Sequence, residues 1–196
     1  MNSMTLHTAN DCQLNSTASK SKFSGSISNE NCYAYAAGEK GCGFSAPESF
    51  NSYGPRFNEN QGGVYATEWT SDGISIWFFP RNEIPSDINC NSSTVDTSSW
   101  PSPVARFDGD DCDWASHFKD LNIVSVPSKV LHDIVLISHQ QVFDITFCGD
   151  WAGQVWSQSS TCTSKASSCQ DYVANHAADF KDTYWSINSL RVYSTC

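Results

Sequence analysis

Alternating apolar and polar positions predict a β-hairpin in the first half of the chain. Residues 64–70 alternate in this way, and Gly62-Gly63 immediately before them marks a turn. Residues 74–79 predict the returning strand, because they follow the turn-forming Ser71-Asp72-Gly73 and end at Pro80, which cannot continue a central strand.

Two further strands are predicted in the second half, at residues 142–147 and 184–193. In the second of them Trp185, Ile187 and Tyr193 fall on one face, since alternate residues of a strand point to the same side. Gly, Ser, Asn and Asp interrupt the sequence every few residues, which is typical of many short strands joined by turns. We therefore expect an all-β fold of mainly antiparallel strands.

One short helix is predicted near residues 169–180. A serine of the Ser167-Ser168 pair can cap its start, and Asp171 places an acid in its first turn. Tyr172, His176 and Phe180 recur at helical spacing and would share one face. Nothing else in the sequence favours a helix strongly.

Composition and charge narrow the class of protein. With 39% hydrophobic residues and a mean hydropathy of −0.39, the 196 residues are typical of a globular domain. No apolar run approaches the ~18 residues of a membrane-spanning helix. The net charge is −10 and the eleven Lys and Arg residues are scattered singly, so no basic surface for nucleic acid is predicted. We expect a monomer with neither nucleic-acid nor membrane partners.

The nine cysteines indicate an oxidising compartment. None forms a CxxC pair and no histidine stands at zinc-finger spacing from them, so neither a metal nor a cofactor is predicted. Two glycosylation sequons, at residues 15–17 and 91–93, agree with a secreted protein. The N-terminus has no signal-peptide pattern and the cysteine count is odd; both are explained if residues that once preceded Met1 are missing.

The sequence contains no carboxylate pair suited to sugar hydrolysis. A retaining glycosidase needs two carboxyl groups ~5–5.5 Å apart, which a Glu-x-Asp-x-x-Glu strand can supply. None of the six glutamates begins or ends such a run, and Glu68 has no acidic partner two positions away. The acidic cluster at residues 108–113 lacks the spacing and closing Glu of an EF-hand, so a solvated turn is the preferred interpretation. The seven tryptophans could pack on sugar rings, although Trp in a β-sandwich is more often a core residue.

Several strings resemble the fungal laminarinase-like endo-β-1,3(4)-glucanases of glycoside hydrolase family 16. They occur in the family's order and span nearly the whole chain: MTLHT at 4–8, GGVYATEWT at 62–70, IWFFPR at 76–81, IP at 84–85, SHF at 116–118, TFCGDWAG at 146–153 and YWSINSL at 184–190. The resemblance implies a concanavalin A-like jelly roll of two curved antiparallel sheets, with β-glucan in the concave cleft. Residues 1–196 would be the C-terminal portion of this domain, with the N-terminal strands missing.

The resemblance also implies the residues of the site. In this family the catalytic Glu-x-Asp-x-x-Glu strand shortly precedes the string that begins here at Met4, so the nucleophile and the acid/base would both fall before Met1. His7 matches a family histidine on the strand beside the catalytic one, and Trp151 matches a cleft tryptophan that stacks on substrate. Glu68 and Trp69 also match the pattern, but a structural role in the hairpin is at least as well supported.

Residues 125–141 depart from the family pattern. Family members run from Ile-Val almost directly into Phe-Asp-x-Thr-Phe-Cys, whereas here an aromatic-free stretch separates Val124 from Val142. We hypothesise that this stretch is a translated, unspliced intron, because a Val codon begins GT and Gln can be CAG. As genuine protein it would form a loop, since an insertion would break a strand's register. An ordinary aliphatic strand is the alternative.

Three functions stay open at this point. The chain is the C-terminal part of a secreted endo-β-1,3(4)-glucanase and inactive as it stands, or a non-catalytic β-glucan-binding module that presents Trp151. The third alternative is a remnant that no longer folds, because half a sandwich exposes strand edges.

Overall fold

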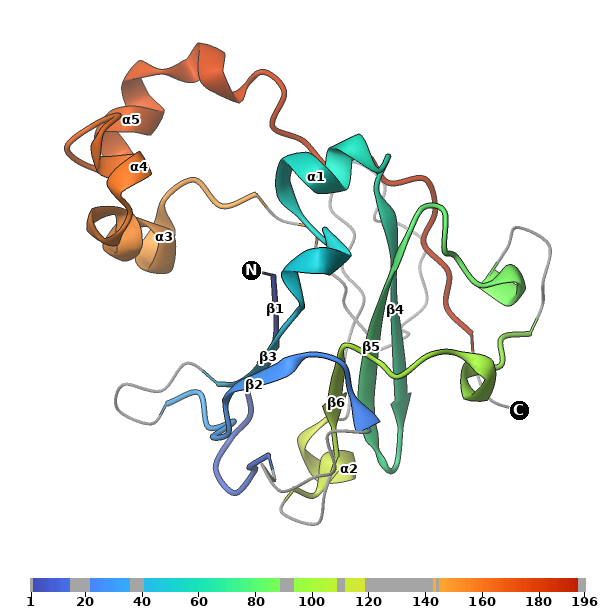
Figure 1. Cartoon of the computed structure of the whole chain (residues 1–196). Helices are drawn as coiled ribbons and strands as arrows, with labels where there is room; N and C mark the ends of the chain where they lie inside the picture. The colour runs from blue at the N-terminus through green and yellow to red at the C-terminus, as the bar shows by residue number, and fades with distance from the viewer. Residues whose placement is uncertain are drawn as a thin grey trace, which may run out of the picture. The chain divides into compact units, whose positions relative to one another are not determined.

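The computed structural model describes residues 2–14, 22–35, 41–88, 94–108, 112–118, 143 and 145–193. Contacts divide the chain into two compact units, residues 1–119 with 193–196 and residues 120–192. All strands found in the described residues belong to the first unit, whereas the regular elements of the second unit are helices (Figure 1).

The first sheet has three short strands in the order β1-β3-β2. They are β1 (Ser3–Leu6), β2 (Ser26–Asn29) and β3 (Cys42–Ser45), and each pair is antiparallel. Phe44 of the central strand lies opposite both Met4 and Ile27, so these apolar side chains share one face. That face is buried, while the alternate residues Ser3 and Thr5 of β1 are exposed.

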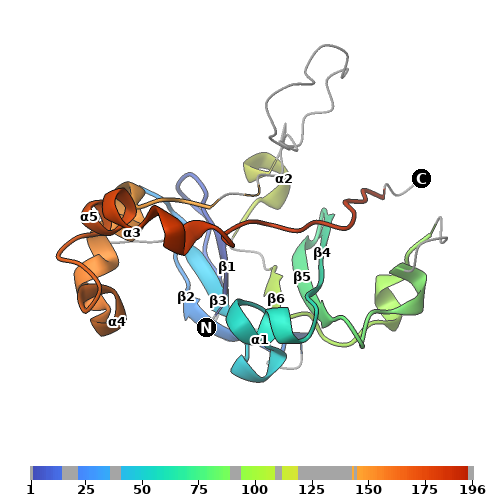
Figure 2. The ribbon, with the colours of Figure 1, turned by 90° about the horizontal axis from the view of Figure 1, so that it is seen from above.

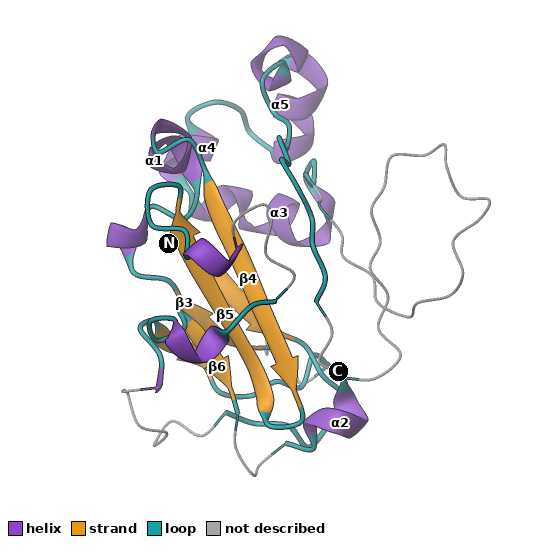
Figure 3. Ribbon diagram, turned by 90° about the vertical axis from the view of Figure 1, so that its right-hand side faces the viewer, coloured by secondary structure: helices purple, strands orange, loops and turns teal. Residues whose placement is uncertain are grey.

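The second sheet has the order β4-β5-β6 and is also antiparallel. Figure 3 shows β4 (Gly63–Thr70), β5 (Gly73–Pro80) and β6 (Ala105–Phe107) side by side. Thr70 lies opposite Gly73, so the predicted hairpin is confirmed with a turn of only two residues. Gly73 has a φ of 134°, and a Cβ there would overlap the carbonyl oxygen of Phe107, so this position requires glycine.

Aromatic side chains from both sheets meet in the core of the first unit. Phe44 of β3 contacts Phe107 of β6 edge to face, with ring centroids 5.0 Å apart, and Phe23 packs against Phe44 at 4.9 Å. Ile74 and Phe78 of β5 belong to the same buried cluster. The prediction of antiparallel sheets packed through one apolar core is confirmed for the described residues.

Short helices and two disulfides complete the first unit. The helices are α1 (Gly54–Glu59), α2 (Trp114–His117) and the 3₁₀ turns η2 (Glu48–Phe50), η3 (Ser86–Ile88) and η4 (Thr97–Ser99). A disulfide joins Cys12 to Cys112 across a sequence separation of 100 residues, and another joins Cys32 to Cys42 across a separation of 10. All four cysteines are buried.

The second unit is helical and has its own disulfide, Cys148–Cys169. Figure 2 shows its helices α3 (Gly149–Val155), α4 (Ser160–Thr163) and α5 (Cys169–Asn175); the 3₁₀ turns η5 (Trp156–Gln158) and η6 (Ala177–Phe180) follow α3 and α5. The buried Tyr172 stacks on His176 with ring centroids 4.6 Å apart, and Phe180 lies 5.8 Å from it. The helix predicted near 169–180 is confirmed, although His176 leaves the helical conformation and divides it.

The predicted C-terminal strands are wrong where the structure describes them. Ile145 and Thr146 are not in a strand, and neither are residues 184–193, whose side chains are exposed. A strand forms only where its backbone groups pair with a neighbouring strand, and the alternation of side chains does not guarantee such a partner. The short helices α1 to α4 were not predicted, because four to seven residues are too few to show a helical period.

Two further features of the sequence, the stretch at 125–141 and the lack of a long apolar run, can be compared with the described residues only in part. The anomalous stretch at 125–141 lies outside them. Within them, no helix combines the length and the apolar character needed to cross a bilayer.

Candidate functional site

The side chain of His7 is exposed directly after β1. Because Met4 of β1 points into the core, the alternation of the strand turns Ser3, Thr5 and His7 to the opposite, solvent-facing side. The strand thus presents its small polar residues and an imidazole on the open face of the first sheet. An imidazole there can donate to and accept from a bound hydroxyl group.

Backbone hydrogen bonds and a disulfide fix the chain on both sides of His7. The Thr8 N–H donates to the Cys32 carbonyl (2.8 Å) and the Ala34 N–H donates to the Thr8 carbonyl (3.0 Å). Cys32 is in turn joined to Cys42 at the start of β3. Thr8, the residue after His7, is therefore tied to the loop that this disulfide closes.

Gly41 allows the backbone of this loop to approach the imidazole. Its φ is +79°, and a Cβ at this position would lie 2.6 Å from Nδ1 of His7, closer than real side chains come. The Asn29 side-chain amide donates to the Gly41 carbonyl at 2.8 Å and holds the glycine in place. The orientation of His7 thus depends on a residue 34 positions away in the sequence.

Two tyrosines next to Thr8 were missed by the sequence reasoning. Tyr33 forms an isolated bridge with Thr8, and its ring lies 6.0 Å from that of Tyr35, which is 84% exposed. An exposed aromatic face such as that of Tyr35 can pack on the C–H face of a sugar. The signal was the Tyr-Ala-Tyr string directly after Cys32.

Trp151 lies in α3, in the second unit, whereas His7 lies in the first. The helix begins at Gly149 directly after Cys148, both residues with positive φ, and the Cys148–Cys169 disulfide anchors its start to that of α5. The structure describes the backbone of Trp151 but not its side chain. That His7 and Trp151 line one cleft stays a prediction.

Glu68 has a structural partner in the second sheet. Its Oε1 accepts a hydrogen bond from Oγ1 of Thr97 at 2.5 Å, which fastens η4 to β4. Among the described residues, Glu68 is the only glutamate in a strand, and its neighbours two positions away are Ala66 and Thr70. The described part of the chain thus offers no retaining carboxylate pair on a strand, and it holds no cluster of metal-ligating side chains.

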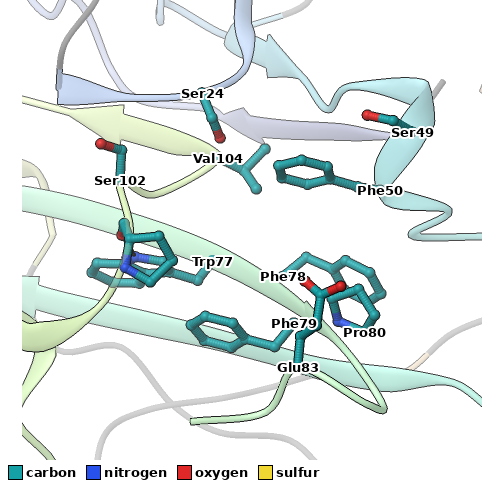
Figure 4. Close-up of a pocket in the computed structure, with 11 residues that line it drawn as sticks. Ser24, Ser49, Phe50, Trp77, Phe78, Phe79, Pro80, Glu83, Ser102 and Val104 are labelled. Carbon is teal, nitrogen blue, oxygen red and sulfur yellow. Dashed lines mark hydrogen bonds between the residues drawn. The ribbon is translucent and has the colours of Figure 1, made fainter.

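One hollow of the first unit is lined mainly by aromatic and other apolar side chains. It has a volume of about 510 Å³, and Figure 4 shows Trp77 and Phe79 on one side of it, with Phe50 and Val104 on the other. The Trp77 indole N–H donates to the Pro101 carbonyl at 2.8 Å, so the indole is fixed in the structure. The only carboxylate among the lining residues is Glu83, so this hollow cannot carry out two-carboxylate hydrolysis.

The resolved pKa shifts lie away from His7. Burial raises the pKa of Tyr65, whose hydroxyl donates to the Ser52 carbonyl. The backbone N–H of Asp96 lowers the pKa of Asp87, and the Trp100 indole donates to the same carboxylate. The hydroxyl of Tyr172 raises the pKa of Lys165 in the second unit. These shifts accompany structural hydrogen bonds and identify no acid/base pair.

Comparison with known proteins relates this chain to glycoside hydrolases along nearly its whole length. A family model described as "XgeA-like, catalytic GH16 domain" matches residues 1–126 and 132–193. An endo-1,3(4)-β-glucanase of Arthroderma benhamiae is 38% identical over 195 residues, which are 98% of this chain and 38% of the relative. The family match leaves out residues 127–131, which fall inside the stretch at 125–141.

Solved structures agree with the sequence matches. Laminarinase 16A of Phanerochaete chrysosporium, a GH16 enzyme solved with two β-glucans in its donor and acceptor sites, has a TM-score of 0.69 and 38% identity. A GH family 16 elongating β-1,3-glucosyltransferase has a TM-score of 0.67 and 34% identity. This chain spans 55% and 54% of those two chains, so it corresponds to about half of each. With a catalytic-domain model matching nearly all of its length, this chain belongs to glycoside hydrolase family 16 and shares the jelly-roll fold of its laminarinases.

Proposed function

We propose that this chain forms part of the substrate cleft of a secreted endo-β-1,3(4)-glucanase and contributes His7 and Trp151 to glucan binding. The observation that supports this most directly is the exposed imidazole of His7, held by Gly41 and the Cys32–Cys42 loop. Its position in the MTLHT string corresponds to the family histidine beside the catalytic strand. Nine cysteines and the fungal glucanase relatives support an extracellular location.

The polypeptide of 196 residues alone does not hydrolyse glucan under this proposal. Retaining hydrolysis needs a nucleophilic carboxylate and an acid/base carboxylic acid on opposite sides of the scissile bond. The sequence contains no Glu-x-Asp-x-x-Glu run, and the one described glutamate in a strand is bonded to Thr97. Hydrolysis by double displacement would belong to a protein that carries this pair on the neighbouring strand.

In that protein the residues of this chain would bind and orient the sugar. His7 would exchange hydrogen bonds with a sugar hydroxyl near the reacting ring, and Trp151 would pack against a C–H face. Orientation of the ring matters because a reaction between aligned groups loses little entropy at the transition state.

Laminarin pull-down tests whether the chain binds glucan, and a reducing-sugar assay tests whether it hydrolyses glucan. We expect binding by the wild-type chain without release of reducing ends. The His7→Ala change should weaken binding about fivefold, the effect of one lost hydrogen bond, and Trp151→Ala about tenfold. Tyr184→Ala removes an exposed aromatic side chain of the second unit and is the matched control. Turnover by the purified chain would refute the claim about the missing pair, and unchanged binding by both variants would refute the cleft.

A second candidate function is a non-catalytic glucan-binding module. The exposed ring of Tyr35, which packs against the half-buried Tyr33, favours it, because an exposed aromatic face can bind sugar without any carboxylate pair. Extending the chain with a catalytic strand distinguishes the two functions. A glucanase fragment gains hydrolysis in that experiment, whereas a binding module gains none.

The stretch at 125–141 is proposed to be a translated intron within this domain. Sequencing of mature transcripts provides the test. Absence of these codons from the message supports the proposal, and their presence refutes it.

A further inference from the structure

A row of polar side chains crosses the second sheet on its outer face. Glu68 of β4 lies opposite Ser75 of β5, and Ser75 lies opposite Arg106 of β6. Residues directly opposite one another in an antiparallel sheet point to the same side. Ile74 and Phe107, on the alternate positions, point into the core, so the polar row points away from it.

Side chains around the row enclose a hollow of about 350 Å³. Asp108 lies two positions beyond Arg106, on the same face, and Lys22 reaches over to it with Nζ 3.2 Å from Oδ2. Thr97 of η4 and Trp77 of β5 line other sides of the hollow.

Hydrogen bonds hold the polar groups in fixed positions. Arg106 donates from Nε to Asp108 at 3.3 Å and from Nη1 to the buried Ser75 hydroxyl at 2.6 Å. Glu68 is fixed by Thr97 at 2.5 Å. A guanidinium has five N–H donors, and the hydrogen bonds of Arg106 within the described residues leave Nη2 available. Groups ordered in this way lose little entropy when a ligand binds.

The charges in the hollow indicate what it can bind. Lys22 and Arg106 balance Glu68 and Asp108, so the set favours neither an anion nor a cation. Its donors and acceptors lie side by side, which suits hydroxyl groups, since each hydroxyl both donates and accepts. The indole of Trp77 adds an apolar surface. A neutral polyhydroxylated ring satisfies all of these features together.

We propose that this hollow, defined by Glu68, Ser75, Arg106, Asp108 and Thr97, binds one glucosyl unit of a neutral glucan at a site whose lining includes neither His7 nor Trp151. The choice of glucan as the sugar rests on the proposed function, whereas the match to a neutral sugar rests on the hollow itself. Such a site would hold a polysaccharide chain on the outer face of the sheet.

Titration of the ¹⁵N-labelled chain with laminaribiose tests the site. The probe should shift the Trp77 indole N–H resonance in a saturable way. Arg106→Lys keeps the charge but removes the fork of donors, and we expect about tenfold weaker binding. Glu68→Gln still accepts from Thr97, so it should preserve the fold and weaken binding less. Arg56→Lys on α1 is the matched control and should leave binding unchanged.

The titration tests the hollow independently of the proposed cleft that contains His7 and Trp151. Shifts at Trp77 that persist in the His7→Ala, Trp151→Ala double variant and decline in Arg106→Lys support the hollow even if laminarin pull-down fails. If the Trp77 resonance does not move, or if Arg106→Lys with an unchanged melting temperature binds as well as wild type, the hollow is overturned while the proposed cleft still stands.

Discussion

The two disulfides of the first unit should differ in their contribution to stability. Cys12–Cys112 spans 100 residues and Cys32–Cys42 spans 10, while all four cysteines are buried to a similar degree. Replacing each pair by alanine removes similar packing, so the difference between the variants reflects the length of the loop in the unfolded chain. The chain-entropy relation gives about 4.7 kcal/mol for the long loop and about 2.7 kcal/mol for the short one.

Urea unfolding of the Cys12→Ala, Cys112→Ala and Cys32→Ala, Cys42→Ala variants measures this difference. The methyl resonance of Met4, which lies buried in the core of the first unit, reports on that unit alone. We expect the long-loop variant to be less stable than the short-loop variant by about 2 kcal/mol. Equal stabilities, or the reverse order, would show that loop entropy does not determine the effect and would refute the reasoning.

Three further predictions concern single positions. Gly73→Ala should lower the free energy of unfolding by about 2 kcal/mol or more, because it introduces a Cβ at positive φ against the Phe107 carbonyl. Gly54 also has a positive φ but lies in open space, so Gly54→Ala should lower the free energy of unfolding by less in the same urea titration. Asp87 has a lowered pKa, chiefly from the Asp96 N–H, so its contribution to stability is present above the unfolded value near 3.8 and is lost as the pH falls through the lower folded pKa. The stability gap between wild type and Asp87→Asn should therefore narrow between pH 5 and pH 2, and a gap that stays constant over this range would contradict the prediction. Tyr172→Phe removes the hydroxyl that donates to Asp179 and accepts from Lys165, and thermal melting of the second unit should fall by an amount equivalent to about 1 kcal/mol; an unchanged melting temperature would contradict the structural role of these bonds.

Patterns within short stretches of sequence predicted the helices and strands that are formed by contacts between residues close together in the chain. The β4–β5 hairpin follows from alternation around a two-residue turn, and α5 follows from the Ser168 cap and the spacing of Tyr172. Contacts between distant residues could not be predicted in this way. The order β1-β3-β2, the Cys12–Cys112 pairing and the close approach of Gly41 to His7 each join positions that no sequence period relates.

The same contrast between local signals and contacts of distant residues applies to the candidate site. The family string indicated His7 as a substrate-binding residue, and this stays a prediction; the structure shows that its side chain is exposed directly after β1. The tyrosines at 33 and 35 were missed because the position of Tyr33 next to Thr8 depends on a bridge between distant parts of the chain. The polar row of Glu68, Ser75 and Arg106 was missed because its register across three strands is a tertiary property.

The backbone around Gly41 constrains how relatives of this chain can change. A Cβ at position 41 would lie 2.4 Å from the Leu6 carbonyl oxygen and 2.6 Å from Nδ1 of His7, at a φ of +79°. Because the carbonyl oxygen belongs to the backbone, glycine is required at position 41 whatever residue stands at position 7. Homologues that keep this loop should therefore keep the glycine even where they replace the histidine, which can be read from sequences alone.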